Sequence, residues 1–331
     1  MPELPAPPAA AAPDPGALPL AEAVARAAAA RAPLIERLLA EDTHAWRIFH
    51  GVAEGRPGLT IDRYGDVLLG QIGYDPPAAD ELAAVEAALG APVVWRPRGA
   101  RLPPTEPTTF VELGLRLRFQ AIHAGLDPYL FLDLRPARRW LKAHAAGRRA
   151  LNAFAYTGAA GLAAAAGGAT AVTHLDHADR WTGVALDNAA LNGLTLEVVQ
   201  MDYFAAVRQW AGLPPGGRGR APPARLKPRR FDLIVLDPPT RAVSPWGTVD
   251  LARDYESLFK PAWLCLDPGG ALLATNHLPG VSADDWIARC RRCADKAGRP
   301  VAEVERITPD GDFPSTDGQP PLKIAVFHVS A

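Results

Sequence analysis

The sequence predicts an α/β protein in which a Rossmann-like, mostly parallel sheet of seven strands follows a smaller N-terminal α+β domain. From about residue 149, short apolar runs alternate with helical patterns, which is typical of parallel strands joined by helices. One apolar run ends in Thr157-Gly158 and leads into a segment of small residues, and the next run ends in Asp176. A glycine turn with an acid after the following strand is how a doubly wound sheet holds a nucleoside-bearing ligand.

Composition limits the class of protein. The chain has 331 residues, of which 48% are hydrophobic and 21% charged, and its formal net charge is -1. This length suggests about two domains, and this composition suits a globular protein with sizeable cores. Because the net charge is close to zero, any nucleic-acid site would have to be a local basic patch.

The cysteines and the N-terminus indicate the compartment. Three cysteines, Cys265, Cys290 and Cys293, are too few for a disulfide framework and suit a reducing compartment. The lone CxxC has no second ligand pair, so we expect two partly buried helix cysteines and no metal site. The sequence has no run of about 18 apolar residues, so we expect no membrane-spanning helix. Glu3, Asp14 and the lack of an early basic residue argue against a signal peptide and favour a cytoplasmic location.

Three parts precede the alternating region. Residues 1–18 contain six prolines and are expected to form a disordered tail. Residues 19–42 show a helical pattern, an N-terminal helix that either docks on the protein or remains a solvated arm. Residues 43–115 are expected to form a small α+β domain on the substrate side. Its expected elements are strands starting near Trp46, Leu59 and Val67, a helix over 77–90 and a strand over 93–97.

One cluster in this small domain could contact nucleic acid. Trp95 to Arg101 places three arginines beside an aromatic ring. Such a cluster can stack on bases and bind phosphates, but it can equally be a solvated turn.

Residues 116–331 carry the alternating pattern. The last two strands are joined without a helix, which suits an antiparallel hairpin and gives the sheet one reversed edge strand. The expected strands are 115–122, 149–156, 170–176, 195–200, 231–236, 270–275, 300–307 and 322–329, and the expected helices are 127–145, 159–167, 179–192, 203–211, 250–266 and 283–297.

Ligands of open α/β sheets lie outside the carboxyl ends of the strands, so the residues that follow each strand are the candidate site. Asp176 can accept hydrogen bonds from ribose hydroxyls. Asp202 can accept from an adenine amino group, with Tyr203 or Phe204 packing on the ring. The spacing is not GxGxxG, so a dinucleotide fits poorly, whereas S-adenosylmethionine, with a ribose and no phosphate, fits better. The strand-end residues are Tyr156, Thr157 and Gly158; Asp176 and His177; Asp202 and Tyr203; Asp237, Pro238, Pro239 and Thr240; and Thr275, Asn276 and His277.

The turn Asp237-Pro-Pro follows an apolar strand and is rigid, because proline fixes φ and removes donors. It would offer a carboxylate and carbonyl oxygens to a planar amine or ring beside a methyl donor. The alternative for Asp237-Pro-Pro is a purely structural turn. The alternative for the turn at Gly158 is an ordinary α/β turn that binds no ligand.

Three segments together resemble the bacterial large-subunit rRNA methyltransferase family, whose members methylate carbon 5 of cytosine or nitrogen 7 of guanine in 23S rRNA. The segments are Asn152-x-Phe154-x-Tyr156-Thr157-Gly158, Ala185-x-x-Asn188-x-x-x-Asn192-Gly193 and Asp237-Pro-Pro239. Residues 129–135 are similar to the family's LDQR segment, and residues 51–66 to its central domain. The resemblance implies a class I methyltransferase domain over 116–331, S-adenosylmethionine as cofactor, a 23S rRNA substrate, and a cofactor site that includes Arg135, Asn152, Phe154 and His177.

The chain departs from the family in three places. The family often has an N-terminal RNA-binding PUA domain, and we expect the residues before Trp46 to be too few to form one. Leu134 replaces the glutamine of LDQR, and Leu126-Asp127-Pro128 replaces a Lys-Thr-Gly. Thr275-Asn276-His277 stands where cytosine-specific members have Ser-Cys-Ser.

The last departure bears on the reaction. Carbon 5 of cytosine is a poor nucleophile, and its methylation normally needs a cysteine thiolate that adds to the ring. Since no cysteine is placed for this, we expect methylation at a ring nitrogen, with Asp237 and Asn276 holding the acceptor edge. His277 is either a base or a histidine that is merely hydrogen-bonded near the strand end. Residues 216–230 form a basic loop, which either contacts phosphates or is a disordered insertion.

Other functions stay open at this point. The same fold could methylate a small molecule or a protein, or the chain could bind the cofactor without catalysis. A nicotinamide oxidoreductase is disfavoured by the absent GxGxxG. The sequence predicts no oligomeric state.

Overall fold

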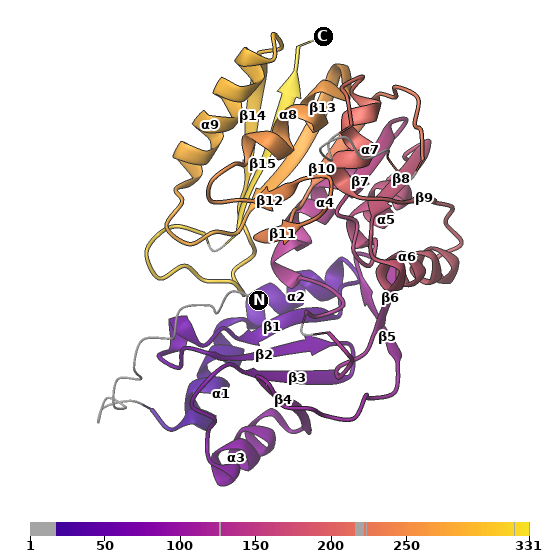
Figure 1. Ribbon diagram of the computed structural model, residues 1–331. Coiled ribbons are helices and arrows are strands. Elements are labelled where there is room, and N and C mark those ends of the chain that lie inside the picture. The colour runs from indigo at the N-terminus through magenta and orange to yellow at the C-terminus, as the bar shows by residue number, and fades with distance from the viewer. Residues whose placement is uncertain (1–17, 126, 216–221, 223, 321, 331) are drawn as a thin grey trace.

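The computed structural model describes residues 18–125, 127–215, 222, 224–320 and 322–330. The expected disordered tail, apart from Leu18, lies outside these residues, as do Arg218 and Arg220 of the basic loop. A small N-terminal domain lies beneath a larger α/β domain (Figure 1).

The large domain is built on a seven-stranded sheet of order β14-β15-β13-β10-β7-β8-β9, so the predicted fold class is confirmed. All neighbours are parallel except β15, which runs antiparallel to both β13 and β14. The strands are β7 (Arg149–Ala153), β8 (Ala171–Asp176), β9 (Glu197–Gln200), β10 (Phe231–Leu236), β13 (Leu266–Asn276), β14 (Val301–Ile307) and β15 (Lys323–Val329).

The reversed strand is not at the edge, and the prediction was wrong on this point. β15 lies between β13 and β14, and β14 forms the edge. The sequences explain this order. β15 is almost entirely buried, whereas β14 carries Glu303, Glu305 and Arg306, which stay exposed to water. Charged side chains also protect an edge strand from pairing with another chain.

Helices cover both faces of this sheet, as the alternating pattern predicts (Figure 1). One apolar cluster joins the sheet to α4, α5 and α6, and a second joins it to α7, α8 and α9. The helices are α4 (Arg135–His144), α5 (Ala159–Ala166), α6 (Asp179–Leu191), α7 (Tyr203–Trp210), α8 (Glu256–Leu264) and α9 (Ala283–Lys296).

Two predicted helices begin later than expected. Residues 241–250 form a hairpin of β11 (Arg241–Val243) and β12 (Thr248–Asp250), so α8 begins only at Glu256. Residues 127–131 are not helical, and the 3-10 turn η2 (Leu132–Leu134) precedes α4. Proline disfavours helical backbone at the residue before it, and Pro128 therefore keeps Asp127 out of a helix.

The small domain has a sheet of order β1-β2-β3-β4, antiparallel except for the parallel pair β3 and β4. One face packs against α1, α2 and α3. The predicted single N-terminal helix is two helices that break at Arg31, and they dock on this face through buried Leu20, Val24, Leu34 and Leu38. The elements are α1 (Leu20–Ala30), α2 (Ala32–Ala40), β1 (Ala45–Phe49), the 3-10 turn η1 (Val52–Glu54), β2 (Leu59–Tyr64), β3 (Val67–Ile72), α3 (Ala79–Leu89) and β4 (Val93–Pro97).

A hairpin of β5 (Thr108–Glu112) and β6 (Leu115–Phe119) connects the two domains. Tyr64 of the small sheet stacks on Phe119 with ring centroids 4.3 Å apart, and both belong to the core of the large domain. The expected boundary between residues 115 and 116 would divide this hairpin. We propose instead a boundary before β5.

Hydrogen bonds from a buried cluster of charged residues in the large domain also tie the domains together. Asp312, in the loop between β14 and β15, accepts hydrogen bonds from the backbone N–H of Arg47 at 3.0 Å and from Arg135 Nη2 at 3.0 Å. Arg135 also pairs with Asp310 and donates to the carbonyl of Ala45. Figure 1 shows this loop descending from the large sheet to β1.

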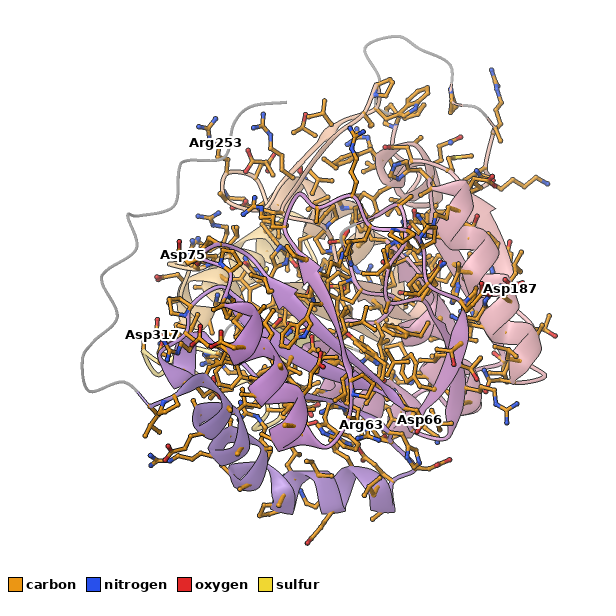
Figure 2. All side chains as sticks on the ribbon, turned by 90° about the horizontal axis from the view of Figure 1, so that it is seen from below. Arg63, Asp66, Asp75, Asp187, Arg253 and Asp317 are labelled. Atoms are coloured by element: carbon orange, nitrogen blue, oxygen red, sulfur yellow. The ribbon has the colours of Figure 1, made fainter. Side chains whose placement is uncertain are left out.

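Charged side chains of both signs surround the molecule when it is seen from below. Asp75 and Asp317 lie on one flank and Asp187 on the opposite one (Figure 2). This mixture matches the net charge of -1. In the part of the chain that the structure describes, no helix has the length and apolar character that crossing a membrane requires.

Candidate active site

The carboxyl ends of β7, β8, β10 and β13 form one rim of the large sheet, because these strands are mutually parallel. Ala153 pairs with Leu236, and Leu236 pairs with Ala274. The strand-end segments that the sequence singled out therefore leave the sheet side by side. This rim faces the small domain (Figure 1).

The glycine turn after β7 is held in an unusual backbone conformation. Phe154, Tyr156 and Gly158 all have positive φ, at 57°, 51° and 88°. For residues other than glycine this conformation is uncommon, and it persists where the surroundings enforce it. Here the Tyr156 hydroxyl donates to Pro128 O at 2.7 Å, and the Thr157 hydroxyl donates to Tyr129 O at 2.7 Å.

Gly158 is required by packing as well as by its φ. A Cβ there would lie 2.7 Å from His174 Cε1 and 2.9 Å from Ala185 Cβ. The crowded side of this glycine thus faces β8 and α6, not the rim. Glycine at this position therefore lets the turn lie close to His174 of β8 and Ala185 of α6, and its predicted place beside the cofactor stays a prediction.

Asp176 lies beside this turn. Its Oδ2 accepts from Tyr156 N at 2.9 Å, and its Oδ1 accepts from Ala178 N at 3.0 Å. Each carboxylate oxygen can accept a second bond, so a pair of ribose hydroxyls fits this side chain. His177 follows with an exposed ring, whose Nδ1 is 3.8 Å from Asp176 Oδ1.

Asp202 caps α7, and its Oδ1 accepts from Phe204 N at 2.8 Å and Ala205 N at 3.1 Å. The other oxygen can still accept from an amino group. Tyr203 and Phe204 are buried and do not present a face to the rim. The Tyr203 ring stacks on Phe154 with centroids 4.7 Å apart, and its hydroxyl donates to Leu258 O. The expected contact of Tyr203 with the cofactor is therefore not supported, and the half-buried Phe154 is the ring nearer the rim.

Two further predicted cofactor residues are buried. Arg135 has no exposed surface, because its guanidinium pairs with Asp310 and Asp312 and donates to the carbonyl of Ala45 in the small domain. These contacts favour a structural role for Arg135 and do not support its predicted contact with the cofactor. Asn152 is buried in β7, and its Nδ2 has no partner among the described residues.

The acceptor side of the rim is built from the ends of β10 and β13. The Thr275 hydroxyl donates to Asp237 Oδ1. Burial raises the pKa of Asp237, and the hydrogen bond from Thr275 opposes this effect. In the turn that follows, Pro238 is buried and Pro239 is exposed. Asn276 is buried, and its Oδ1 accepts from Leu278 N at 2.9 Å, so Asn276 shapes the turn after β13.

Sequence reasoning missed two charged groups near this edge. Burial raises the pKa of Asp133 to about 6, and the neighbouring Asp237 acts in the same direction while Arg47 opposes it. Arg47 comes from β1 and binds Asp62 through both carboxylate oxygens. Asp133 is the acid of the segment similar to LDQR, and this similarity could have marked it as a site residue. No feature of the sequence marks Arg47, because its position depends on how the two domains meet.

The cysteines lie away from the rim. Cys265, Cys290 and Cys293 are all buried, and burial raises the pKa of each thiol, for Cys265 to about 12. Cys265 precedes β13, at the end of the sheet opposite the rim. A thiol of this kind is a poor nucleophile, because the thiolate is the reactive form. The prediction that no cysteine serves the acceptor agrees with this arrangement.

The two expected basic patches, residues 95–101 and the loop 216–230, have only some of their basic side chains exposed to solvent. Arg96 is buried and donates to Gly125 O, and the Trp95 indole donates to Glu86, so only Arg98 and Arg101 remain exposed. In the basic loop, Arg229 pairs with Glu197 and Arg230 donates to Leu264 O and Leu266 O. Arg225 and Lys227 are exposed.

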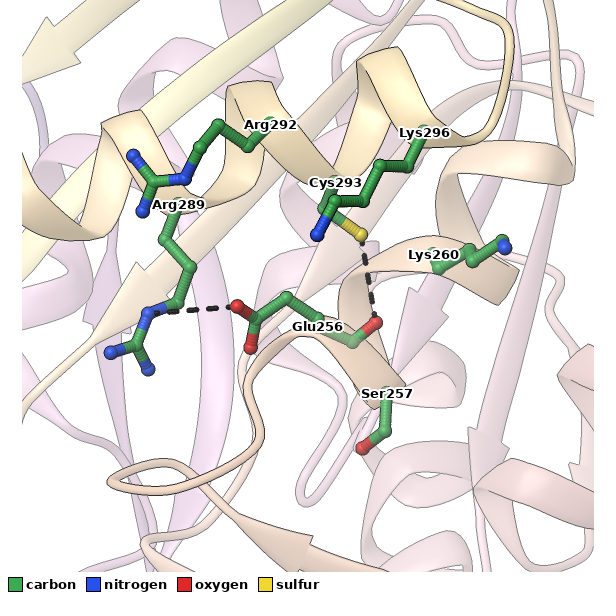
Figure 3. Close-up of a pocket in the computed structure, with 7 residues that line it drawn as sticks. All are labelled: Glu256, Ser257, Lys260, Arg289, Arg292, Cys293 and Lys296. Carbon is green, nitrogen blue, oxygen red and sulfur yellow. Dashed lines mark hydrogen bonds and ion pairs between the residues drawn. The ribbon is translucent and has the colours of Figure 1, made fainter.

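A cavity of about 290 Å³ lies between α8 and α9 (Figure 3), and none of the strand-end residues lines it. We refer to this cavity as the groove between α8 and α9. Its lining is mostly basic, and Glu256 pairs with Arg289 at 3.6 Å. The sequence did not indicate this groove, because its residues come from two helices separated by a strand. The lining residues are Glu256, Ser257, Lys260, Arg289, Arg292, Cys293 and Lys296.

Comparison with known proteins agrees with this geometry. The chain is 29% identical over 308 residues to "Ribosomal RNA large subunit methyltransferase I" of Klebsiella pneumoniae, covering 86% of this chain and 72% of that one. It is 31% identical to "Ribosomal RNA large subunit methyltransferase" of Deinococcus radiodurans, covering 82% of this chain and 69% of that one.

The fold is shared with a SAM-dependent methyltransferase of Streptococcus mutans, at a TM-score of 0.75 and 23% identity, covering 94% of this chain and 81% of that one. A second solved structure, the methyltransferase SMU.776 in complex with SAH, superimposes with a TM-score of 0.76 at the same identity of 23% and the same coverage, 94% and 81%. The family model described as "S-adenosylmethionine-dependent methyltransferase" matches residues 99–328, well over half of the sequence. The chain therefore belongs to the S-adenosylmethionine-dependent methyltransferases.

Proposed function

We propose that this methyltransferase modifies a base of 23S rRNA, and that it does so at a nitrogen rather than at carbon 5. The observation that carries the choice of atom is the acceptor edge, where Asp237 and a rigid proline turn stand while all three cysteines are buried elsewhere. The relatives named for ribosomal RNA at 29% and 31% identity support the choice of substrate.

On the cofactor side, we assign the ribose hydroxyls to Asp176 and the adenine amino group to the free oxygen of Asp202. The turn Tyr156-Thr157-Gly158 would border the ligand through its backbone, with Phe154 against the ring and His177 at the outer edge. When bound, S-adenosylmethionine supplies an electrophilic methyl group. The side chains orient this group and the acceptor, and they exclude water from the rim.

On the acceptor side, Asp237 and the Pro238-Pro239 turn would hold the edge of the base. Asn276 would support this edge by fixing the turn after β13. A nitrogen nucleophile needs orientation and desolvation and no covalent attachment to the enzyme. Such a mechanism fits an edge that has a carboxylate and no reactive thiol.

For the RNA backbone, exposed basic side chains supply the phosphate contacts. Arg98, Arg101, Arg225 and Lys227 are exposed, and the groove between α8 and α9 adds Lys260, Arg289, Arg292 and Lys296. Contacts of this type give affinity that falls as salt rises. An enzyme with this substrate would act in the cytoplasm.

Mass spectrometry of 23S rRNA nucleosides from cells with and without the gene tests the proposal. We expect one methylated nucleoside to be lost in the deletion strain, to return with the wild-type gene, and to stay absent with Asp237→Asn. An unchanged nucleoside profile in the deletion strain would contradict the proposed substrate.

A further inference from the structure

Two side chains at the acceptor edge are joined by a short contact that the cofactor site does not explain. Thr240 Oγ1 and His277 Nε2 are 2.6 Å apart. Thr240 follows the Asp237-Pro-Pro turn after β10, and His277 follows β13. The parallel pairing of these two strands brings the residues together across 37 positions of sequence.

The position of the pair suits contact with an acceptor. Thr240 is exposed just after β10, and His277 is half-buried just after β13. The hydroxyl is therefore the more accessible of the two groups, and the imidazole is its partner. A threonine hydroxyl can donate one hydrogen bond and accept others at the same time.

The charges around His277 come from two strands. Asp237, at the end of β10, favours the imidazolium, whereas Lys323 of β15 disfavours it. Burial is the largest influence and lowers the pKa of His277, which favours the neutral ring. A neutral imidazole has one nitrogen that can accept a proton, and Asp237 is near enough to stabilise the charge that would follow.

We propose that Thr240 and His277 form a proton relay, and that the methylated atom is a nitrogen that carries a hydrogen before the reaction. This inference rests on the proposed function and specifies its acceptor. The acceptor N–H bonds to Thr240 Oγ1, and the Thr240 hydroxyl bonds to His277 Nε2.

The step is balanced as follows. The nitrogen lone pair forms the new N–CH₃ bond while the carbon–sulfur bond of the sulfonium breaks and its electron pair stays on sulfur as a thioether. The proton of the nitrogen passes to Thr240 Oγ1 as the hydroxyl proton passes to His277 Nε2. The imidazolium then returns the proton to water.

This relay selects a class of base positions. Ring N–H groups and exocyclic amino groups lose a proton on methylation, so a base accelerates their reaction. Nitrogen 7 of guanine carries no hydrogen, so the relay has no proton to remove there. Carbon 5 of cytosine does lose a proton, but it also needs a nucleophile, and a relay of Thr240 and His277 does not replace the missing thiolate.

Single-turnover methylation of 23S rRNA from the deletion strain tests the relay, with the full-length protein, saturating S-adenosylmethionine and a pH range of about 5.5 to 9. We expect the wild-type rate to fall on the acid side, because protonated His277 cannot accept a proton. His277→Gln should lower the plateau at least about 100-fold and remove the acid limb. Thr240→Val should lower the rate similarly, and Thr240→Ser should restore most of it. His44→Gln, at an exposed histidine of the small domain, is the matched control.

The outcomes separate this inference from the function on which it rests. If wild-type protein methylates the rRNA but His277→Gln keeps the wild-type rate and acid limb, the relay is wrong and the function stands. A product methylated at guanine nitrogen 7 or cytosine carbon 5 overturns the relay in the same way. If the wild type transfers no methyl group to rRNA, the proposed function fails, and the inference with it. Unchanged cofactor affinity in each variant, measured by calorimetry, shows that the variant is folded.

Discussion

The Asp237 carboxylate accepts a hydrogen bond from the Thr275 hydroxyl, which joins the ends of β10 and β13 where both strands leave the sheet. Thr275 is fully buried, so this contact holds the carboxylate in one orientation. It also stabilises the charged form of Asp237 against the effect of burial, which raises the pKa of this group. An oriented carboxylate of this kind can hold the edge of a base without being consumed.

Replacing Asp237 by asparagine should therefore reduce methyl transfer far more than cofactor binding. We expect the transfer rate to fall about 100-fold or more, since one preorganised polar group at a reacting edge contributes on this scale. Single-turnover transfer to rRNA and calorimetric titration with the cofactor measure the two effects. Asp250→Asn, in β12, is a control of the same chemistry. A tenfold loss of cofactor affinity with unchanged transfer would place Asp237 in the cofactor site alone.

Asp176→Asn tests the ribose site. The variant keeps one oxygen for the backbone N–H groups but loses a charged acceptor, and hydrogen bonds to charged groups contribute about 1.5–3 kcal/mol. The cofactor Kd should rise by roughly 10- to 100-fold. Asp179→Asn, at the start of α6, should leave the Kd within about twofold. Equal affinity of Asp176→Asn and wild type would remove Asp176 from the site.

Arg135→Met should destabilise the fold without a direct effect on cofactor contacts. It would leave Asp312 buried and without its guanidinium partner, and breaking a buried pair in this way costs about 3–5 kcal/mol. Arg306→Ala removes an exposed pair with Asp284 and should cost at most about 1 kcal/mol. Denaturant unfolding with and without cofactor distinguishes the two variants. Wild-type stability in Arg135→Met would contradict the structural role.

The buried His174 predicts a loss of stability in acid. Burial lowers its pKa to about 4, below the unfolded value of 6.5, so the unfolded chain binds the extra proton first. The contribution of His174 to the free energy of unfolding is complete above pH 6.5. It falls as the pH drops toward 4, by about 3 kcal/mol in all. His174→Met should flatten this part of the unfolding free energy against pH. His44→Gln should keep the wild-type slope, and an equal slope in His174→Met would refute the assignment.

Charge reversal in the groove between α8 and α9 tests its contact with RNA. Arg292→Glu with Lys296→Glu should weaken rRNA binding and reduce the slope of log K against log salt by about 1–2. Arg26→Glu with Arg37→Glu changes the net charge equally on α1 and α2 and should leave the slope close to the wild-type value. Fluorescence anisotropy at several salt concentrations measures both. Identical slopes in the two double variants would exclude the groove.

Much of the fold was predictable because it depends on local patterns. The alternation of apolar runs and helices after residue 149 gave the parallel sheet, and Asp176 and Asp237 lie at strand ends as expected. The position of β15 inside the sheet was not predicted, although the charged residues of β14 contained the information. Strand order depends on burial across the whole sheet, which a local pattern does not report.

The site was less predictable because side-chain directions depend on tertiary contacts. Arg135 and Tyr203 occupy positions that suit a ligand by sequence, yet one turns into an ion pair with Asp312 and the other stacks beneath Phe154. Arg47 reaches the neighbourhood of Asp133 only because the small sheet folds against the rim. Long-range pairs of this kind carry no local sequence signature.

The bond from Arg47 N to Asp312 spans 265 positions, which has a consequence for biosynthesis. A ribosome releases the chain from its N-terminus, and early domains generally fold as they emerge. Here the β1 edge that Asp312 caps must wait until 265 more residues have been made before that partner appears. The nascent small domain would therefore pass through much of translation with water as the partner of Arg47 N, and the loop between β14 and β15 would displace this water late.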